Sequence, residues 1–205
     1  MTTEGNNNSI EPFVRNGISF NTLVVSPSET ITSMQIICFF DFQKNQYYSG
    51  GTYAVNQHFG NELHEIRSKG IFRGNALETL LITPCLNQIP ARLLLLIGLG
   101  DPEKLSLDLL ESVGYAITME AIKLKVTDFC FAPSLKDAGI TLSFGKTSVS
   151  KALGQGIVKA LKASAVLVQK NLAQPILLTK INLLAGQPQA VYGHEGLRQA
   201  FGKED

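Results

Sequence analysis

The chain has 205 residues, of which 44% are hydrophobic and 17% are charged, and its formal net charge is +1. This composition indicates a folded protein with a sizeable core, and so small a net charge provides no general attraction to nucleic acid or to an anionic membrane. The apolar runs are far shorter than the roughly 18 residues of a membrane-spanning helix, and the first residues lack the pattern of a signal peptide. We therefore expect a cytoplasmic protein without a membrane or nucleic-acid partner.

The first third of the chain is expected to begin with a flexible leader and to continue as two strands and a helix. Residues 1–16 are polar and rich in asparagine, which is typical of a loosely attached segment. Apolar runs predict strands at Ile18–Val25 and Ile31–Phe42, with Ser26-Pro27-Ser28 as the turn between them. A helix is predicted over about Tyr53–Ser68.

The middle of the chain predicts a strand-helix-strand unit preceded by a further strand. Strands are expected at Ala76–Thr83 and Arg92–Ile97, and Gly98-Leu99-Gly100 is interpreted as a structural turn. Apolar residues recur at spacings of three and four over Leu105–Lys123, which predicts a helix with one buried stripe. A short apolar strand follows at Phe129–Ala132.

The last third predicts a long amphipathic helix at Ser148–Lys170 and a strand at Pro175–Leu184, which we expect at the edge of the sheet or as an interaction arm. A tail follows from residue 185 to 205, with one helical turn at Glu195–Phe201. Strands that alternate with helices of this length predict a three-layer α/β domain with a mixed sheet over residues 17–184.

Three segments in this order resemble the N-terminal domain of the leucyl aminopeptidase (cytosol aminopeptidase) family. They are IFRGNALETLLITP (Ile71–Pro84), IPARLLLLIGLGDPEKLSLDLLESVGYAI (Ile89–Ile117) and FCFAPSLKDAG (Phe129–Gly139). The resemblance extends over roughly Met34–Lys170. It implies a fold similar to macro domains, the modules that bind ADP-ribose.

The same resemblance implies that this chain is not itself an enzyme. The family carries its metal-binding catalytic signature, Asn-Thr-Asp-Ala-Glu-Gly-Arg-Leu, in a second domain, and these 205 residues contain no match to it. We therefore expect no cofactor and a non-catalytic assembly or regulatory module that associates with itself or with a protein partner, with Ile176–Leu184 as a pairing edge. One alternative is a macro-type binding module for a nucleotide or ADP-ribose-like anion. Another is one part of an aminopeptidase whose metal site lies on a second chain.

A ligand site is predicted for the alternative of a macro-type binding module. Gly50, Gly51 and Thr52 open the first predicted helix, where free backbone N–H groups and small residues suit a small anion. Two glycines are also compatible with an ordinary tight turn. The loop from Ser134 to Gly139 follows a strand and is expected to border the same pocket, because ligands of α/β sheets bind beyond the carboxyl ends of strands.

Other motifs do not reach the spacing that their chemistry requires. Gly98-Leu99-Gly100 lacks the third glycine of a dinucleotide fingerprint, and Gly145-Lys146-Thr147 lacks the earlier glycine of a phosphate-binding loop. The three cysteines are too widely spaced for a disulfide framework or a zinc site. The remaining group is interpreted as solvated charge on one helix, not as a metal site: His58, Glu62, His64 and Glu65.

Overall fold

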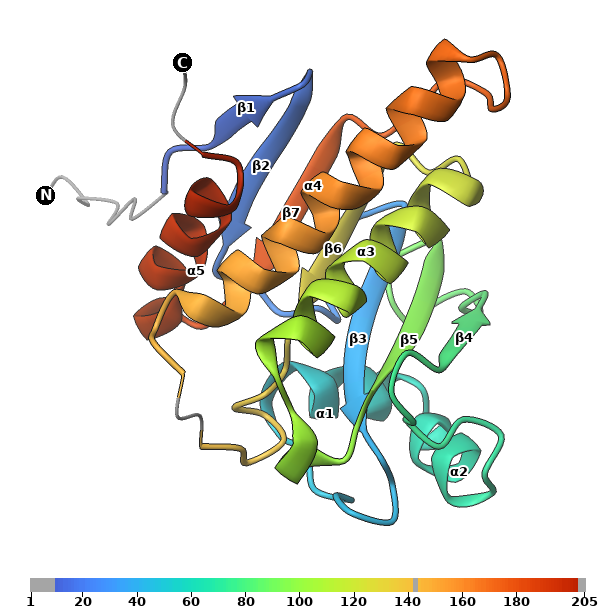
Figure 1. Cartoon of the computed structure of the whole chain (residues 1–205). Helices are drawn as coiled ribbons and strands as arrows, with labels where there is room; N and C mark the ends of the chain where they lie inside the picture. The colour runs from blue at the N-terminus through green and yellow to red at the C-terminus, as the bar shows by residue number, and fades with distance from the viewer. Residues whose placement is uncertain (1–9, 142–143, 203–205) are drawn as a thin grey trace, which may run out of the picture.

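The centre of this computed structural model is a mixed sheet of seven strands within the described residues, 10–141 and 144–202. In chain order the strands are β1 (Phe13–Arg15), β2 (Ile18–Leu23), β3 (Met34–Phe40), β4 (Thr79–Ile82), β5 (Leu93–Gly100), β6 (Asp128–Ala132) and β7 (Lys180–Leu184). They lie in the spatial order β1-β2-β7-β6-β3-β5-β4 (Figure 1). The edge strands β1 and β4 run antiparallel to their neighbours, whereas the strands between them are parallel.

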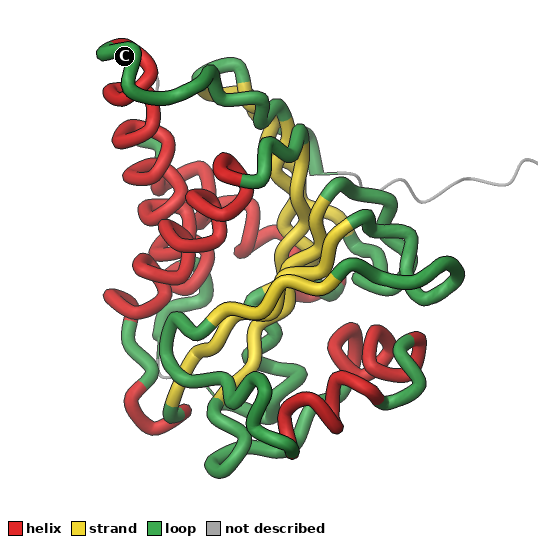
Figure 2. The backbone as a smooth tube through the Cα atoms, turned by 90° about the vertical axis from the view of Figure 1, so that its right-hand side faces the viewer, coloured by secondary structure: helices red, strands yellow, loops and turns green. Residues whose placement is uncertain are grey.

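Helices cover both faces of this sheet, as the side view in Figure 2 shows. One face carries α3 (Leu107–Lys123), α4 (Ser148–Gln169) and α5 (Gln187–Ala200). The other face carries the shorter helices α1 (Gly50–His58) and α2 (Glu62–Ser68), and a 3-10 turn, Pro102–Lys104, precedes α3. The predicted three-layer α/β fold with a mixed sheet is therefore confirmed.

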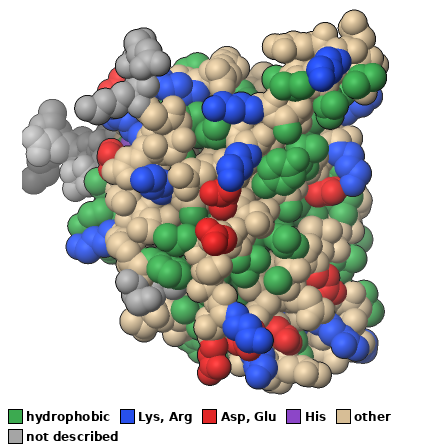
Figure 3. Space-filling model, viewed as in Figure 1, with side chains coloured by type: hydrophobic (Ala, Val, Ile, Leu, Met, Phe, Trp, Pro, Cys, Tyr) green, Lys and Arg blue, Asp and Glu red, His purple; other side chains and the backbone are tan. Residues whose placement is uncertain are grey.

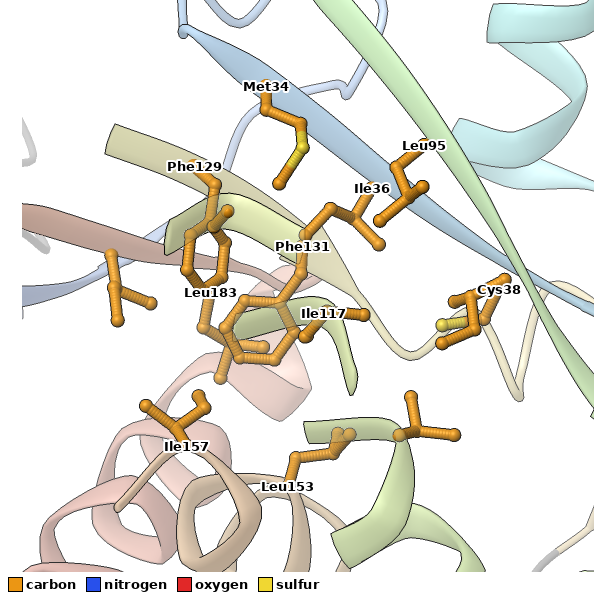
Figure 4. Packing of buried hydrophobic residues seen from close by; sticks show 14 of the residues in the cluster. Met34, Ile36, Cys38, Leu95, Ile117, Phe129, Phe131, Leu153, Ile157 and Leu183 are labelled. Atoms are coloured by element: carbon orange, nitrogen blue, oxygen red, sulfur yellow. The ribbon is translucent and has the colours of Figure 1, made fainter. Parts of the chain in front are cut away.

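Two apolar cores lie on opposite faces of the sheet because side chains alternate along each strand. In β3 every residue is buried: Met34, Ile36 and Cys38 face α3 and α4, whereas Ile37 and Phe39 face α1 and α2. The larger core is shown in Figure 4, with these labelled side chains from the sheet, α3 and α4: Met34, Ile36, Cys38, Leu95, Ile117, Phe129, Phe131, Leu153, Ile157 and Leu183. Full burial of one such aliphatic or aromatic side chain contributes about 1.5–3 kcal/mol.

One row of polar side chains crosses four adjacent strands on the α1 side of the sheet. Asn21, Asn182, Cys130 and Gln35 are register partners in β2, β7, β6 and β3. The Nδ2 amide of Asn21 donates to Oδ1 of Asn182 at 2.8 Å, and Nδ2 of Asn182 lies 3.3 Å from Sγ of Cys130. Because each of these contacts joins two strands, the row favours a single register for β7.

The position of β7 corrects the prediction of an edge strand. β7 pairs with β2 on one side and with β6 on the other, and it covers Lys180–Leu184 instead of Pro175–Leu184. Its backbone hydrogen bonds are therefore used within the sheet, so the expectation that Ile176–Leu184 forms a free pairing edge was wrong. Its partner β2 lies near the opposite end of the chain, so no local pattern could reveal this pairing.

The predicted helix Tyr53–Ser68 is in fact two helices. Gly60 and Asn61 have φ angles of 59° and 70°, so the chain enters the left-handed region and α1 ends before α2 begins. The remaining predicted strands and helices are present, with their ends shifted by a few residues.

Both ends of the described chain contain regular structure that was not predicted. Within the expected leader, β1 pairs with β2, while residues 1–9 lie outside the described part. After residue 185 the chain forms α5, a helix of 14 residues, where one turn at Glu195–Phe201 was expected. Phe13 of β1 stacks on Phe20 with ring centroids 5.0 Å apart, and Phe201 contacts both rings. The two ends of the chain therefore share one aromatic cluster.

The glycines at the end of β5 belong to the strand and are not a turn. A Cβ atom on Gly98 would lie 1.8 Å from the carbonyl oxygen of Asn75, so only glycine lets this loop approach the strand. The carboxylate of Glu78 holds the same loop by accepting backbone N–H groups of Arg73, Gly74 and Asn75 at 2.9–3.2 Å. Glu78 thus ties the loop around Gly74 to the start of β4 at Thr79.

His194 of α5 makes stability depend on pH. Its Nδ1 lies 3.3 Å from the hydroxyl of Thr22, its ring packs edge-on against Phe13, and only 7% of the residue is exposed. Burial lowers the pKa of His194 below 6.5, with a further contribution from Arg198 opposed by Glu195. The native state thus binds fewer protons than the unfolded state, so the free energy of unfolding is expected to fall as the pH drops below about 6.5.

Urea unfolding between pH 7.5 and pH 5 measures this effect. His194→Gln is expected to reduce the slope in this window, whereas the exposed His58→Gln should leave it unchanged. Equal slopes in all three proteins would contradict the assignment to His194.

Candidate functional site

A cleft of about 820 Å³ lies at the carboxyl ends of the parallel strands. Its walls come from the ends of β2, β6 and β7 and from the first turns of α1, α4 and α5. The lining segments are Val24–Pro27, Ser49–Gly51 and Ala132–Asp137, with further residues from 146–150 and 183–193. This is the end of an open α/β sheet at which ligands bind, and the volume suits a small organic molecule.

The predicted anion site at the start of α1 already contains a carboxylate of the protein. Oδ2 of Asp137 accepts the backbone N–H of Thr52 at 3.4 Å, and the carboxylate is also hydrogen-bonded by the N–H of Gly51. The main-chain oxygen of Asp137 accepts the N–H of Ser49 at 2.7 Å. Gly50 has a φ of 53°, and a Cβ atom there would lie 2.6 Å from Oδ1 of Asp137. The free N–H groups of the helix are thus used by a side chain from a loop that lies 85 residues later in the chain.

Two opposing effects set the protonation of this carboxyl group. Burial raises the pKa of Asp137 above its ordinary value of 3.8, while the N–H groups of Thr52 and Gly51 and the nearby Lys136 lower it, and the net direction is upward. The carboxylate therefore carries its charge at a cost in desolvation, and the dipole of α1 offsets part of that cost.

The five residues predicted for the ligand site do not all reach the cleft. Gly50, Gly51 and Ser134 line it. Thr52 is 2% exposed, and its hydroxyl has no hydrogen-bond partner in the described structure. Gly139 lies outside the lining and packs against the ring of Tyr47.

Several lining residues were not predicted from the sequence. Lys146 donates from Nζ to the hydroxyl of Tyr192 at 3.1 Å and lies 4.6 Å from the centre of that ring. Lys136 and Asp137 belong to the quoted loop but were not singled out. The wall from α5 could not be found by motif, because it depends on a helix whose existence was itself not predicted.

A smaller hollow of about 290 Å³ lies on the other side of α1 and is lined by aromatic and amide side chains. They are Gln46, Tyr47, Tyr48, Tyr53, Asn56, Asn61 and His64. The hydroxyl of Tyr48 lies 3.2 Å from Nδ1 of His64. His58 and Glu62, interpreted as sharing one helix with His64, lie on different helices, α1 and α2. Within the part of the chain that the structure describes, no three His, Cys, Asp or Glu residues are placed to hold a metal ion.

The face of the molecule that carries α3 and α4 presents charges of both signs (Figure 3). On the face shown in Figure 3, which carries α3 and α4, positive and negative side chains are interspersed. Lys159 of α4, for example, pairs with Glu111 of α3. None of the helices among the described residues has the length and hydrophobicity needed to cross a bilayer.

A comparison with protein families identifies the chain. The model of the cytosol aminopeptidase family, N-terminal domain, matches residues 36–161, which is more than half of the sequence. The chain belongs to this family. The resemblance inferred from the three motifs is therefore confirmed, and the match concerns the N-terminal domain of the cytosol aminopeptidase family, not its catalytic domain. No curated protein sequence matched the chain.

Solved structures show the same fold at low sequence identity. A macrodomain of Oceanobacillus iheyensis with MES bound aligns with a TM-score of 0.64 and 15% identity, covering 93% of this chain and 96% of that one. A mutant of tomato leucine aminopeptidase aligns with a TM-score of 0.62 and 15% identity over 90% of this chain, but only 37% of the tomato chain is covered. A Trypanosoma brucei macrodomain in complex with ADP gives 0.59 and 13% identity, over 87% of this chain and 69% of that one. This cytosol aminopeptidase family domain thus has a macrodomain-like fold.

Proposed function

We propose that this chain is a non-catalytic binding module whose cleft holds a small molecule of the nucleotide or ADP-ribose type. The observation that carries the proposal is the cleft of about 820 Å³ at the carboxyl ends of β2, β6 and β7. Two similar macrodomain structures are described as containing ADP, one of them from Oceanobacillus iheyensis and the other from Trypanosoma brucei. Their low identity to this chain limits that support to the fold.

The lining offers the contacts that such a ligand needs. Val25 and Val149 provide apolar surface for a planar base, and Lys136 and Lys146 provide positive charge at the rim. The hydroxyl group of Ser134 adds a polar group on a residue with a φ of 54°, a conformation uncommon outside glycine. The proposal requires binding only, and it assigns no reaction to these side chains.

Isothermal titration calorimetry with adenosine, AMP, ADP and ADP-ribose tests the proposal. At least one of these compounds is expected to bind, and amide NMR signals of Gly50, Gly51 and Ser134 should shift on its addition. Lys146→Ala should weaken the binding of the phosphate-bearing compounds by about tenfold, the usual effect of losing one charged contact. The exposed Lys162→Ala, outside the cleft, serves as the matched control.

The second candidate remains an assembly or regulatory role. It is supported by the edge strand β4, whose outer side is unpaired within the described sheet and whose Leu81 is 42% exposed. Absence of heat with all four compounds, together with a dimer in sedimentation velocity, would favour this role over ligand binding.

A further inference from the structure

The start of α1 is filled by protein atoms on both sides of its two glycines. The carboxylate of Asp137 lies against Gly50, and the ring of Pro27 lies 2.6 Å from where a Cβ atom of Gly51 would be. The N–H groups of Gly51 and Thr52 already donate to Asp137. A phosphate at this position would therefore lose its hydrogen-bond donors and meet a carboxylate instead.

The loop that carries Asp137 is held in place by several main-chain contacts. Within the loop, the N–H of Ala138 donates to the oxygen of Ser134 at 3.0 Å, and the N–H of Gly139 donates to that of Lys136 at 2.9 Å. From outside, the side-chain amide of Asn45 donates to the oxygen of Ala138 at 2.9 Å. The backbone of the loop that carries the Asp137 carboxylate is thus fixed by hydrogen bonds.

We propose that Asp137 is a specificity-determining residue of the cleft, which selects nucleosides and other ligands that carry no phosphate at the start of α1. The inference rests on the ligand-binding function proposed above and names the ligand class. Charge repulsion and lack of space both act against a pyrophosphate at this point, because the native carboxylate takes the place that the anion would occupy. A neutral ribose hydroxyl can instead donate a hydrogen bond to the same carboxylate.

Ligand affinity provides the first test. The wild-type protein is expected to bind adenosine about tenfold more tightly than ADP-ribose, which carries its charge on a pyrophosphate. Asp137→Ala should abolish this preference by strengthening ADP-ribose binding about tenfold, the effect of removing roughly one pK unit of unfavourable charge interaction. Asp108→Ala removes an exposed carboxylate from the first turn of α3 and should change neither affinity.

Thermal unfolding without any nucleotide provides the second test. Asp137→Ala leaves the α1 N–H groups without their acceptor and is expected to lower Tm by about 2–4 °C, as loss of a helix cap does in a domain of this size. Sodium phosphate or sodium formate, compared with sodium chloride at equal ionic strength, should raise the Tm of Asp137→Ala back toward that of the wild type. Neither anion should raise the Tm of the wild type or of Asp108→Ala to the same extent. Asp137→Asn removes the charge but keeps the shape and one acceptor oxygen, so it should retain the wild-type Tm and gain less affinity for ADP-ribose than Asp137→Ala.

The two tests separate this inference from the proposed function. If no compound binds the wild type but phosphate restores the Tm of Asp137→Ala, the carboxylate does occupy an anion position at the start of α1, but the ligand-binding function and the selectivity that rests on it are overturned. If adenosine binds but neither Asp137 variant gains affinity for ADP-ribose and no anion restores Tm, the Asp137 assignment is overturned. Tighter binding of ADP-ribose than of adenosine by the wild type would overturn it as well.

Discussion

Gly156→Ala is expected to lower the free energy of unfolding by about 3 kcal/mol, because α3 and α4 cross with almost no space between their backbones. A Cβ atom on Gly156 would lie 1.9 Å from the carbonyl oxygen of Glu111 and 2.5 Å from the nitrogen of Tyr115. The contact is reciprocal, since a Cβ atom on Gly114 would lie 2.1 Å from the carbonyl oxygen of Leu153. A methyl group can enter only if the two helices separate, and the core beneath them would then lose contacts.

The measurement is the free energy of unfolding from urea titration, with Gly193→Ala as the matched control. Gly193 is also helical, but its nearest neighbour would be Cδ2 of Leu183 at 2.7 Å, the movable end of a side chain. Alanine also favours a helix by about 1 kcal/mol over glycine. We expect this control to stay within about 1 kcal/mol of the wild type, and similar losses for both variants would contradict the explanation by backbone contact.

Arg67→Ala is expected to destabilise the protein by a similar amount, about 3 kcal/mol. Arg67 is 2% exposed, and its Nη2 donates to the carbonyl oxygens of Phe40 at 2.8 Å and Asn45 at 3.3 Å. Its guanidinium carbon lies 4.4 Å from the ring centre of Phe39 and 5.1 Å from that of Phe42. Burial lowers the pKa of Arg67 to about 10, so the side chain is still charged at neutral pH and is stabilised by carbonyl groups and aromatic rings.

Two further variants identify which of these contacts matters. Arg67→Met keeps most of the side-chain volume but leaves the carbonyl oxygens unpaired, so its free energy of unfolding should be about 2 kcal/mol below that of the wild type. Arg73→Ala, an exposed arginine close by in the chain, should be nearly neutral. In urea unfolding, the loss in free energy of unfolding is expected to be largest for Arg67→Ala, smaller for Arg67→Met and smallest for Arg73→Ala. If Arg67→Met is as stable as the wild type, the carbonyl contacts contribute little.

The layers of the fold could be predicted from the sequence because the patterns that indicate helices and strands are local. The buried apolar stripe that predicts α3 and the apolar run that predicts β3 each lie within one continuous segment. Helix α5 could not be predicted because it contains Gly193 and Gly196 and has a polar composition. Its stability comes from tertiary packing, since a Cβ atom on Gly196 would lie 2.4 Å from the carbonyl oxygen of Thr147 at the start of α4.

At the candidate site, too, contacts between segments far apart in the chain could not be predicted from the sequence. The glycine pair at the start of α1 is visible as a motif and does line the cleft, but the motif gives no information on what its N–H groups bind. That role falls to Asp137, which the sequence places in a different segment. Pairing of this kind depends on the completed sheet, because only then do the loops after β3 and β6 lie side by side.

The strand order has a consequence for synthesis on the ribosome. The hairpin of β1 and β2 is made before the other strands, yet it joins the rest of the described sheet only through β7, which begins at Lys180. An isolated hairpin is at best marginally stable in water, so β2 stays unpaired on one side until β7 has been made. Closure of this long loop should be a late and slow step of folding. During that interval, the exposed edge of β2 can pair with other polypeptides.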